Sequence, residues 1–149
     1  MKIEEEIKQR TFKDVYHKVY INLIFTSGWL QEQQAVIFKK YGLTLPQFNI
    51  LRILRGQHPK PATVNLLIER MLDKTSNASR IVDKLEAKEL VTRHQCPKDR
   101  RTVDILITDK GLALLQQIDE AEGTQIKGLQ NISALEAEEL SRLLDKMRE

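Results

Sequence analysis

A cluster of positive charge marks one short segment in the second half of the chain. Three cationic side chains fall within four consecutive positions there, Lys98, Arg100 and Arg101, with Asp99 among them. Pro97 cannot donate a backbone hydrogen bond to a strand ladder, so the segment is predicted to be a loop between strands. Cations gathered at a loop tip suit a phosphate backbone or a narrow minor groove.

A second polar group precedes this loop. It combines short hydrogen-bonding side chains with cations further along: Ser76, Asn77, Ser79, Arg80 and Lys84. Side chains near the start of a helix can reach base edges when that helix lies in the major groove. The two groups together therefore indicate contact with duplex DNA. An alternative for Arg80 and Lys84 is an ion pair with Asp83 or Glu86 in place of a phosphate contact.

A helix and a hairpin are needed to position these side chains. Apolar residues recur with helical spacing over residues 75–88, which predicts a helix with one apolar stripe: Ala78, Ile81, Val82 and Leu85. Residues 90–92 and 103–107 have the β-branched and apolar content of strands. They are expected to pair as a hairpin with the cationic loop at its tip.

Three stretches of sequence carry a family resemblance. One is the run Asp99-Arg100-Arg101, then Leu106-Ile107-Thr108 and Lys110-Gly111. The second is residues 79–86 followed by Leu90-Val91 and Arg93, and the third is residues 43–48. They resemble the wing signature, the recognition helix with its strand entry, and the start of helix 2 in MarR-type transcriptional regulators. The resemblance spans residues 12–149. Glu89 stands where that family usually has Gly, so no left-handed helix cap is predicted there.

The resemblance implies roles for particular residues. Arg101 would be the wing arginine that enters the minor groove, and Asp99 would orient it through a charge-assisted bond. The resemblance also implies a homodimer, and a small aromatic effector bound between the dimer helices and the DNA-reading part. Four aromatic residues are candidates either for the core or for such a pocket: Phe25, Trp29, Phe38 and Phe48.

Composition excludes several other classes of protein. The chain has 149 residues, 41% hydrophobic and 30% charged, which predicts one soluble globular domain. No apolar run approaches the roughly 20 residues that span a bilayer, and the charged start does not predict a signal peptide. The single cysteine, Cys96, fits a reducing cytoplasm. It is expected to be a bystander thiol, although the cations beside it leave a redox sensor as the alternative.

Neither a catalytic motif nor a cofactor-binding motif occurs. The three histidines lack metal-ligand spacing, and no nucleophile elbow, P-loop or dinucleotide fingerprint is present. An enzyme is therefore not expected, and neither a metal nor a cofactor is predicted.

The distribution of charge is more informative than its total of +3. Residues 111–149 hold 4 Lys/Arg and 8 Asp/Glu, a net of −4, whereas residues 1–110 hold 20 and 13, a net of +7. This asymmetry is expected if one end of the protein meets phosphate and the other does not.

The remaining sequence predicts helices on both sides of the hairpin. One long helix is expected over residues 3–41, with Gly28 as a bend or break. Thr44 with Gln47 should cap a second helix that stops at Gly56, and Thr63 should cap a third. Either Asp73 or Thr75 should cap the recognition helix. After residue 108 the chain returns to helix, and Ser133 with Glu136 should cap the last one.

These elements define a mainly α fold with a small β-hairpin wing, a winged helix-turn-helix. A single domain is expected, with residues 43–108 as the DNA-binding part and residues 1–41 and 109–149 as dimerisation helices. The last helix has an apolar stripe that the small middle part cannot cover: Leu140, Leu143, Leu144 and Met147. A symmetric dimer would bury it, and a monomer with its ends folded back is the alternative.

The sequence thus favours a cytoplasmic, homodimeric transcriptional regulator, a repressor that binds double-stranded DNA and is released by a small ligand. The alternative is a winged helix kept as a protein-interaction module without DNA binding.

Overall fold

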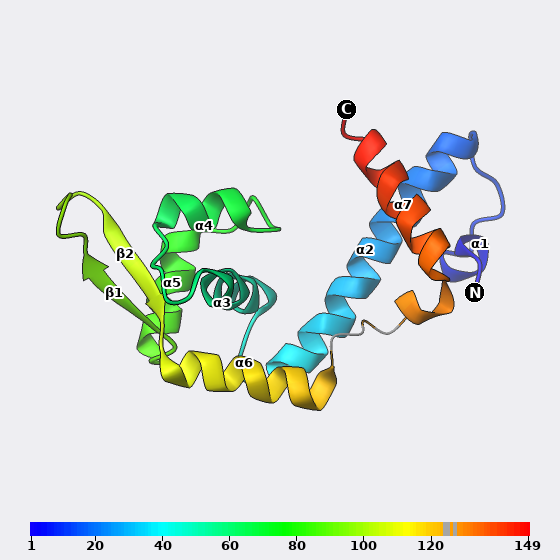
Figure 1. Ribbon diagram of the computed structural model, residues 1–149. Helices are drawn as coiled ribbons and strands as arrows, with labels where there is room; N and C mark the ends of the chain where they lie inside the picture. Colours follow the sequence, from blue (N-terminus) through cyan, green and yellow to red (C-terminus); the bar gives the residue numbers. More distant parts are fainter. Residues whose placement is uncertain (124–125, 127) are drawn as a thin grey trace.

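The computed structural model describes residues 1–123, 126 and 128–149. The chain is mainly α-helical with one antiparallel hairpin, which confirms the predicted fold class (Figure 1). In chain order, its elements are α1 (Ile3–Glu6), α2 (Val15–Lys39), α3 (Leu45–Gln57), α4 (Val64–Arg70), α5 (Ala78–Ala87), β1 (Val91–Gln95), β2 (Val103–Ile107), α6 (Asp109–Glu122), the short 3-10 turn η1 (Leu129–Asn131) and α7 (Ala134–Lys146). No helix in the described part of the chain is both long and apolar enough to cross a bilayer.

The single helix predicted over residues 3–41 is wrong, because the chain breaks between α1 and α2. The side chain of Asp14 accepts a hydrogen bond from the backbone N–H of His17 at 2.8 Å and caps α2. An N-cap residue has extended backbone angles, so it ends any helix that precedes it. Gly28 does not break the helix, since α2 continues through it to Lys39.

The predicted starts of the next two helices are confirmed. Thr44 and Gln47 form a capping box at the start of α3, and the hydroxyl of Thr63 accepts from the N–H of Leu66 at 3.2 Å. The predicted stop at Gly56 is one residue early, because α3 includes Gly56 and ends at Gln57.

The end of α5 has a left-handed cap that the sequence did not predict. Glu89 has φ +60°, its N–H bonds the carbonyl of Glu86 at 2.8 Å, and the N–H of Leu90 bonds the carbonyl of Leu85 at 3.0 Å. These two bonds make a Schellman motif, with Leu85 and Leu90 both buried as its apolar pair. The hydroxyl of Thr108 donates to the Glu89 carbonyl at 2.7 Å, so contacts from α6's N-cap help to hold Glu89 in this conformation.

The two strands of the hairpin pair with each other, and β2 also pairs with the chain just before α4. Val91 lies opposite Ile107 and Arg93 opposite Ile105, and Ala62 pairs with Ile105 as an isolated bridge. Gly111 packs closely here, since a Cβ on it would lie 2.5 Å from the carbonyl of Leu90. This contact sets how near α6 can approach the hairpin.

One hydrophobic core holds α3, α4, α5, α6 and the hairpin together. Its fully buried side chains come from all of these elements: Ile50, Leu51, Leu54, Leu67, Val82, Leu85, Val91, Ile105 and Leu115. Each such side chain stabilises the fold by about 1.5–3 kcal/mol relative to exposure. The helix-turn-helix and the wing are thus parts of one packed unit.

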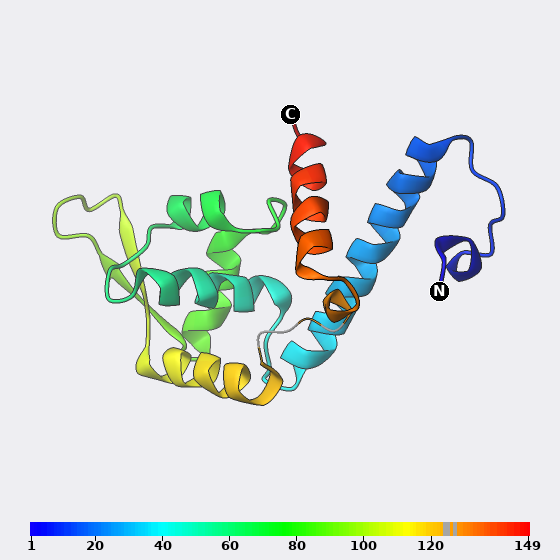
Figure 2. The same ribbon diagram turned by 45° about the vertical axis from the view of Figure 1, so that its right-hand side comes forward.

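The two ends of the chain lie away from this unit. Figures 1 and 2 show α2 and α7 at one side of the molecule, with α6 leading toward them from the hairpin. Large apolar side chains on α2 and α7 are exposed, among them Tyr16, Ile24, Leu140, Leu143 and Met147. Leu144 is half-buried.

Candidate nucleic-acid interface

The recognition helix α5 begins three residues later than the sequence predicts. Asn77 is its N-cap, and its side-chain oxygen accepts from the N–H of Arg80 at 3.1 Å. The predicted caps, Asp73 and Thr75, are therefore wrong. Asn77 remains exposed, and its side-chain NH₂ faces no partner among the described residues.

Asp73 organises the turn before the helix. Its carboxylate accepts from the hydroxyl of Thr75 at 2.7 Å, from the Thr75 N–H at 2.9 Å and from the hydroxyl of Ser76 at 2.8 Å. These bonds, the Thr75 hydroxyl foremost, hold the pKa of Asp73 below its ordinary value. Ser76 is half-buried and its hydroxyl proton is used, so only its oxygen lone pairs are left for a DNA donor.

The outer face of α5 carries the remaining predicted contact residues. Ser79, Arg80 and Lys84 are exposed. Within the described part of the chain neither cation forms an ion pair, so the alternative pairing with Asp83 or Glu86 is not adopted. Both positive charges are therefore directed to solvent.

Arg93 on β1 is a functional candidate that the sequence analysis did not select. Its guanidinium lies 2.5 Å from the carboxylate of Asp83 and donates to the carbonyl of Ser79 at 3.1 Å. It therefore ties the hairpin to the outer face of the recognition helix at two points. The only sequence signal was its place in the resemblance, since spacing alone does not pair a strand residue with a helix residue.

The wing tip is a hydrogen-bonded turn. The N–H of Cys96 bonds the carbonyl of Thr102 at 2.9 Å, and the side chain of Gln95 donates to the carbonyl of Arg100 at 2.8 Å. These bonds close the loop beyond the last paired residues of the strands. The turn displays three exposed cations: Lys98, Arg100 and Arg101.

Asp99 shapes this turn through the backbone. Its carboxylate accepts from the N–H of Arg101 at 3.0 Å and from the hydroxyl of Thr102 at 3.2 Å. Among the described residues no bond joins Asp99 to the Arg101 guanidinium, in contrast to the charge-assisted bond that the sequence analysis expected. Asp99 thus orients Arg101 by holding its backbone, and the guanidinium is directed to solvent.

Two of the four candidate aromatic residues line a cavity. The rings of Phe38 and Phe48 stack with centroids 3.9 Å apart, and they border a cavity of about 260 Å³ between α2, α3 and α6. Arg52 lies at its edge, 5.7 Å from the Phe48 ring. Lys40, Asp119 and Glu122 also line the cavity, so it combines apolar walls with a few charged groups of both signs, as small-molecule sites do.

Phe25 and Trp29 lie elsewhere, on α2. Phe25 is half-buried, and Trp29 is 37% exposed with its ring against Gly128. Neither lines this cavity, and neither belongs to the core. Only Phe38 is part of the buried core, with Phe48 packed against it.

Comparisons with known proteins agree with this geometry. The sequence model of the MarR family matches residues 43–103. The HTH-type transcriptional regulator MgrA of Staphylococcus aureus is 32% identical over 111 residues, which are 74% of this chain and 74% of MgrA.

Two solved structures share the fold. A mutant of MarR from E. coli, complexed with operator DNA, matches with a TM-score of 0.73 and 23% identity over 85% of this chain and 91% of that one. The organohalide-sensing transcriptional regulator RdhR-CbdbA1625, in its 2,4-dichlorophenol-bound form, matches with a TM-score of 0.79 and 21% identity over 94% of this chain and 85% of that one.

Proposed function

This chain belongs to the MarR family of DNA-binding transcriptional regulators, and on that premise we propose that it is a cytoplasmic homodimeric repressor released from its operator by a small aromatic compound. Its relatives and its fold are those of transcription factors, so it is not an enzyme. The observation that carries the proposal is the separation of two kinds of surface. Cations that form no ion pair with the described residues lie on the outer side of α5 and on the wing, whereas exposed apolar side chains lie on α2 and α7.

The proposed DNA contacts follow from the positions of the polar side chains along α5. Asn77, Ser79 and Arg80 lie at the start of α5, where side chains reach base edges or nearby phosphates in the major groove. Ser76 would accept a hydrogen bond beside them. Lys84 further along α5 would meet the phosphate backbone.

The wing would extend the contact beyond the major groove. Lys98 and Arg100 would bind phosphates, and Arg101 would enter the adjacent minor groove. Asp99 supports this role by its bond to the Arg101 backbone. MarR from E. coli, with the same fold, has been crystallised on operator DNA.

Dimerisation is supported by the exposed apolar residues of the terminal helices. Val15, Tyr16, Tyr20 and Leu140 are between 44% and 81% exposed in one chain. Exposed apolar side chains of this kind are more stable when a second copy covers them, and two-fold symmetry is the commonest solution. The two recognition helices would then meet half-sites about 34 Å apart on one face of the duplex.

Ligand control is supported by the cavity beside Phe38 and Phe48. It lies where α2 meets α3 and α6, so an occupant would touch both the terminal helices and the winged unit. A ligand changes DNA affinity only by its differential affinity for the two states of the protein. The structure of RdhR-CbdbA1625 with 2,4-dichlorophenol gives a precedent for a phenolic ligand in this fold.

The test starts with selection of operator fragments from a random duplex library. The purified protein should enrich a two-fold symmetric sequence, and a panel of phenols and aromatic carboxylates should contain members that weaken its binding. Phe48→Ala should abolish that response while DNA affinity without ligand is retained. If no duplex binding with a salt dependence is found, the interaction-module alternative replaces the proposal.

A further inference from the structure

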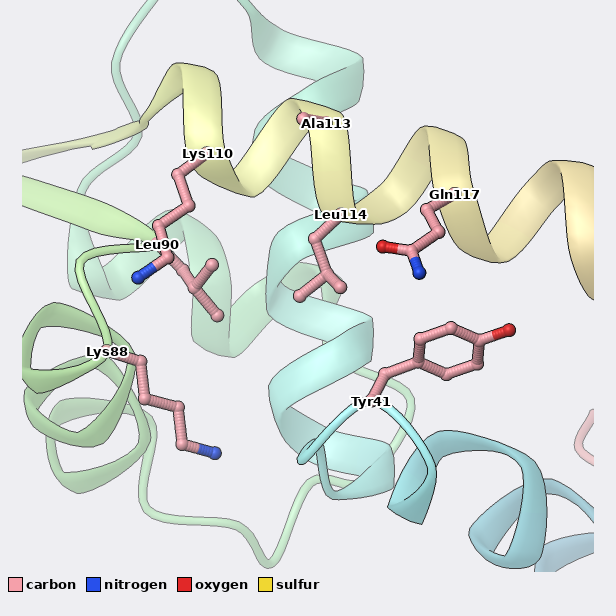
Figure 3. Close-up of a pocket in the computed structure, with 7 residues that line it drawn as sticks. All are labelled: Tyr41, Lys88, Leu90, Lys110, Ala113, Leu114 and Gln117. Atoms are coloured by element: carbon pink, nitrogen blue, oxygen red, sulfur yellow. The ribbon is translucent and has the colours of Figure 1, made fainter.

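A second cavity, of about 410 Å³, opens on the side of α6 that faces the end of α5 (Figure 3). Six of its lining residues matter here: Tyr41, Lys88, Leu90, Lys110, Leu114 and Gln117. Figure 3 shows Lys88 and Lys110 on one side, with Tyr41 and Gln117 toward the other end. The cavity is separate from the one beside Phe38 and Phe48, and the described residues that line one do not line the other.

Lys88 brings an uncompensated positive charge to this cavity. Its ammonium donates to the carbonyl of Gly42 and, at 3.1 Å, to the side-chain oxygen of Gln47. Both acceptors are neutral, and within the described residues no carboxylate pairs with Lys88. An ammonium has three donors, so one remains for an anion.

Lys110 adds a second cation with only a weak partner. Its ammonium lies 3.4 Å from the carboxylate of Glu89, and the two side chains are 61% and 83% exposed. Solvent screens such an exposed pair, so Glu89 holds the Lys110 ammonium only weakly. The two lysines and Glu89 therefore leave one net positive charge at this side of the cavity, which matches a monoanion.

The wall between the lysines and the Tyr41 end of the cavity is apolar. Leu90, beside Lys110, is buried, and Leu114, between Leu90 and Tyr41, is half-buried (Figure 3). The Tyr41 hydroxyl donates to Glu122 at 3.1 Å, and Glu122 is itself paired with Lys40 at 3.1 Å. Burial and the Glu122 carboxylate raise the pKa of Tyr41, so the phenol stays neutral. No free negative charge from this pair opposes an anion.

We propose that this cavity binds an amphiphilic monoanion, a carboxylate with a short alkyl chain. The carboxylate would lie between Lys88 and Lys110, and the chain would cover Leu90, Leu114 and the Tyr41 ring. A cavity of this volume lies within the range of small-molecule sites, which combine apolar walls with few charged groups.

Ligand binding at this site would change the affinity for DNA through Lys88. This residue follows α5 directly and bonds the turn between α2 and α3 through Gly42. An anion that draws the ammonium away would loosen one of the links that place the recognition helix. This consequence for DNA rests on the proposed function, whereas ligand binding itself does not.

The test uses octanoate, with octanol and octylamine as probes of equal chain length, in titrations of the full protein without DNA. Nuclear magnetic resonance should show shifts at the methyl groups of Leu90 and Leu114 with octanoate. Octanol should bind at least about tenfold more weakly, since it lacks the charge-assisted bonds, and octylamine should not bind. Equal binding of octanoate and octanol would overturn the proposal.

Variants of the two lysines test which of them binds the carboxylate. Lys88→Gln and Lys110→Gln should each weaken octanoate binding, by about tenfold and about threefold respectively, whereas Lys146→Gln on α7 should not. Lys110 is exposed, so its variant keeps the test valid if Lys88→Gln unfolds. Unchanged affinity in Lys110→Gln, or a loss confined to Arg52→Gln at the other cavity, would contradict the assignment. Because DNA is absent from these titrations, a protein that binds no operator can still confirm the anion site.

Discussion

The guanidinium of Arg93 lies 2.5 Å from the carboxylate of Asp83, and this ion pair joins strand β1 to the exposed face of recognition helix α5. The same guanidinium bonds the carbonyl of Ser79, near the start of that helix. The contact ties together the two elements that are proposed to contact DNA. It also pairs the negative charge of Asp83, which lies on the face of α5 that is proposed to approach DNA.

Arg93→Ala should weaken operator binding by about tenfold with little loss of stability. The pair is partly exposed, so its contribution to unfolding is expected to be below about 1 kcal/mol. A double-mutant cycle with Asp83→Ala, followed by operator titration and urea unfolding, separates the two effects. Equal operator affinity in wild type and Arg93→Ala would show that the contact does not position α5.

Asn77→Ala should affect stability and specificity together, because this side chain caps α5. Loss of the cap is expected to cost about 1 kcal/mol in unfolding. Loss of a base contact would cost about 1–3 kcal/mol on the preferred operator. Asn77→Ser is the control, since serine retains the cap but not the amide. If Asn77→Ser has the same affinity and base preference for the operator as wild type, the amide does not contact a base.

Arg101→Ala should weaken binding to operator and random DNA alike. Its guanidinium is exposed and is proposed to meet a minor groove, where the contact is largely electrostatic. The slope of log affinity against log salt should fall by about one unit for the lost contact, or about two in a dimer. Lys39→Ala, at the end of α2, serves as the control for a simple change of net charge. An unchanged slope would make the wing assignment wrong.

Leu143→Glu should convert a dimer into monomers. Leu143 is 44% exposed on the apolar stripe of α7, and a buried carboxylate would be unpaired in a two-fold interface. Light scattering should give twice the 17.3 kDa chain mass for wild type and one chain mass for the variant at micromolar concentration. Ser141→Glu, off that stripe, should remain dimeric. A monomeric wild type would contradict the proposed assembly.

Glu89→Gly should stabilise the protein by about 1 kcal/mol. A residue with a Cβ is strained in the left-handed conformation that Glu89 adopts, and glycine is not. Because the Glu89 side chain also pairs weakly with Lys110, Glu89→Gln provides the control that removes only the charge. Urea unfolding of the three proteins measures the difference. A less stable Glu89→Gly would mean that the side chain contributes more than the strain costs.

Local signals were sufficient for several parts of the structure. The capping residues Thr44, Thr63 and Ser133 start their helices as predicted, because a cap bonds only to the backbone within the next three residues. The β-branched and apolar content of the strands, together with Pro97, placed the hairpin and its loop. Family resemblance then identified the wing and the recognition helix. The match to MgrA and to the MarR family model confirms the resemblance.

Competition between local signals caused the errors near the recognition helix. Asp73, Thr75 and Asn77 can each cap a helix, and the sequence does not rank them. In the structure Asp73 bonds Thr75 and Ser76, which leaves Asn77 as the cap. Likewise, the break before α2 depends on Asp14, whose capping role the apolar periodicity did not reveal.

The sequence by itself determined the order of the elements and the classes of side chain that are proposed to meet DNA, since both depend on neighbouring residues. Only the tertiary structure decided contacts between distant positions. Arg93 reaches Asp83, Thr108 bonds the carbonyl of Glu89, and Lys88 and Lys110 come to one cavity. These relationships arise because the shared core packs α5, the hairpin and α6 against one another. Packing of that kind joins residues by shape and volume, which no spacing along the chain encodes.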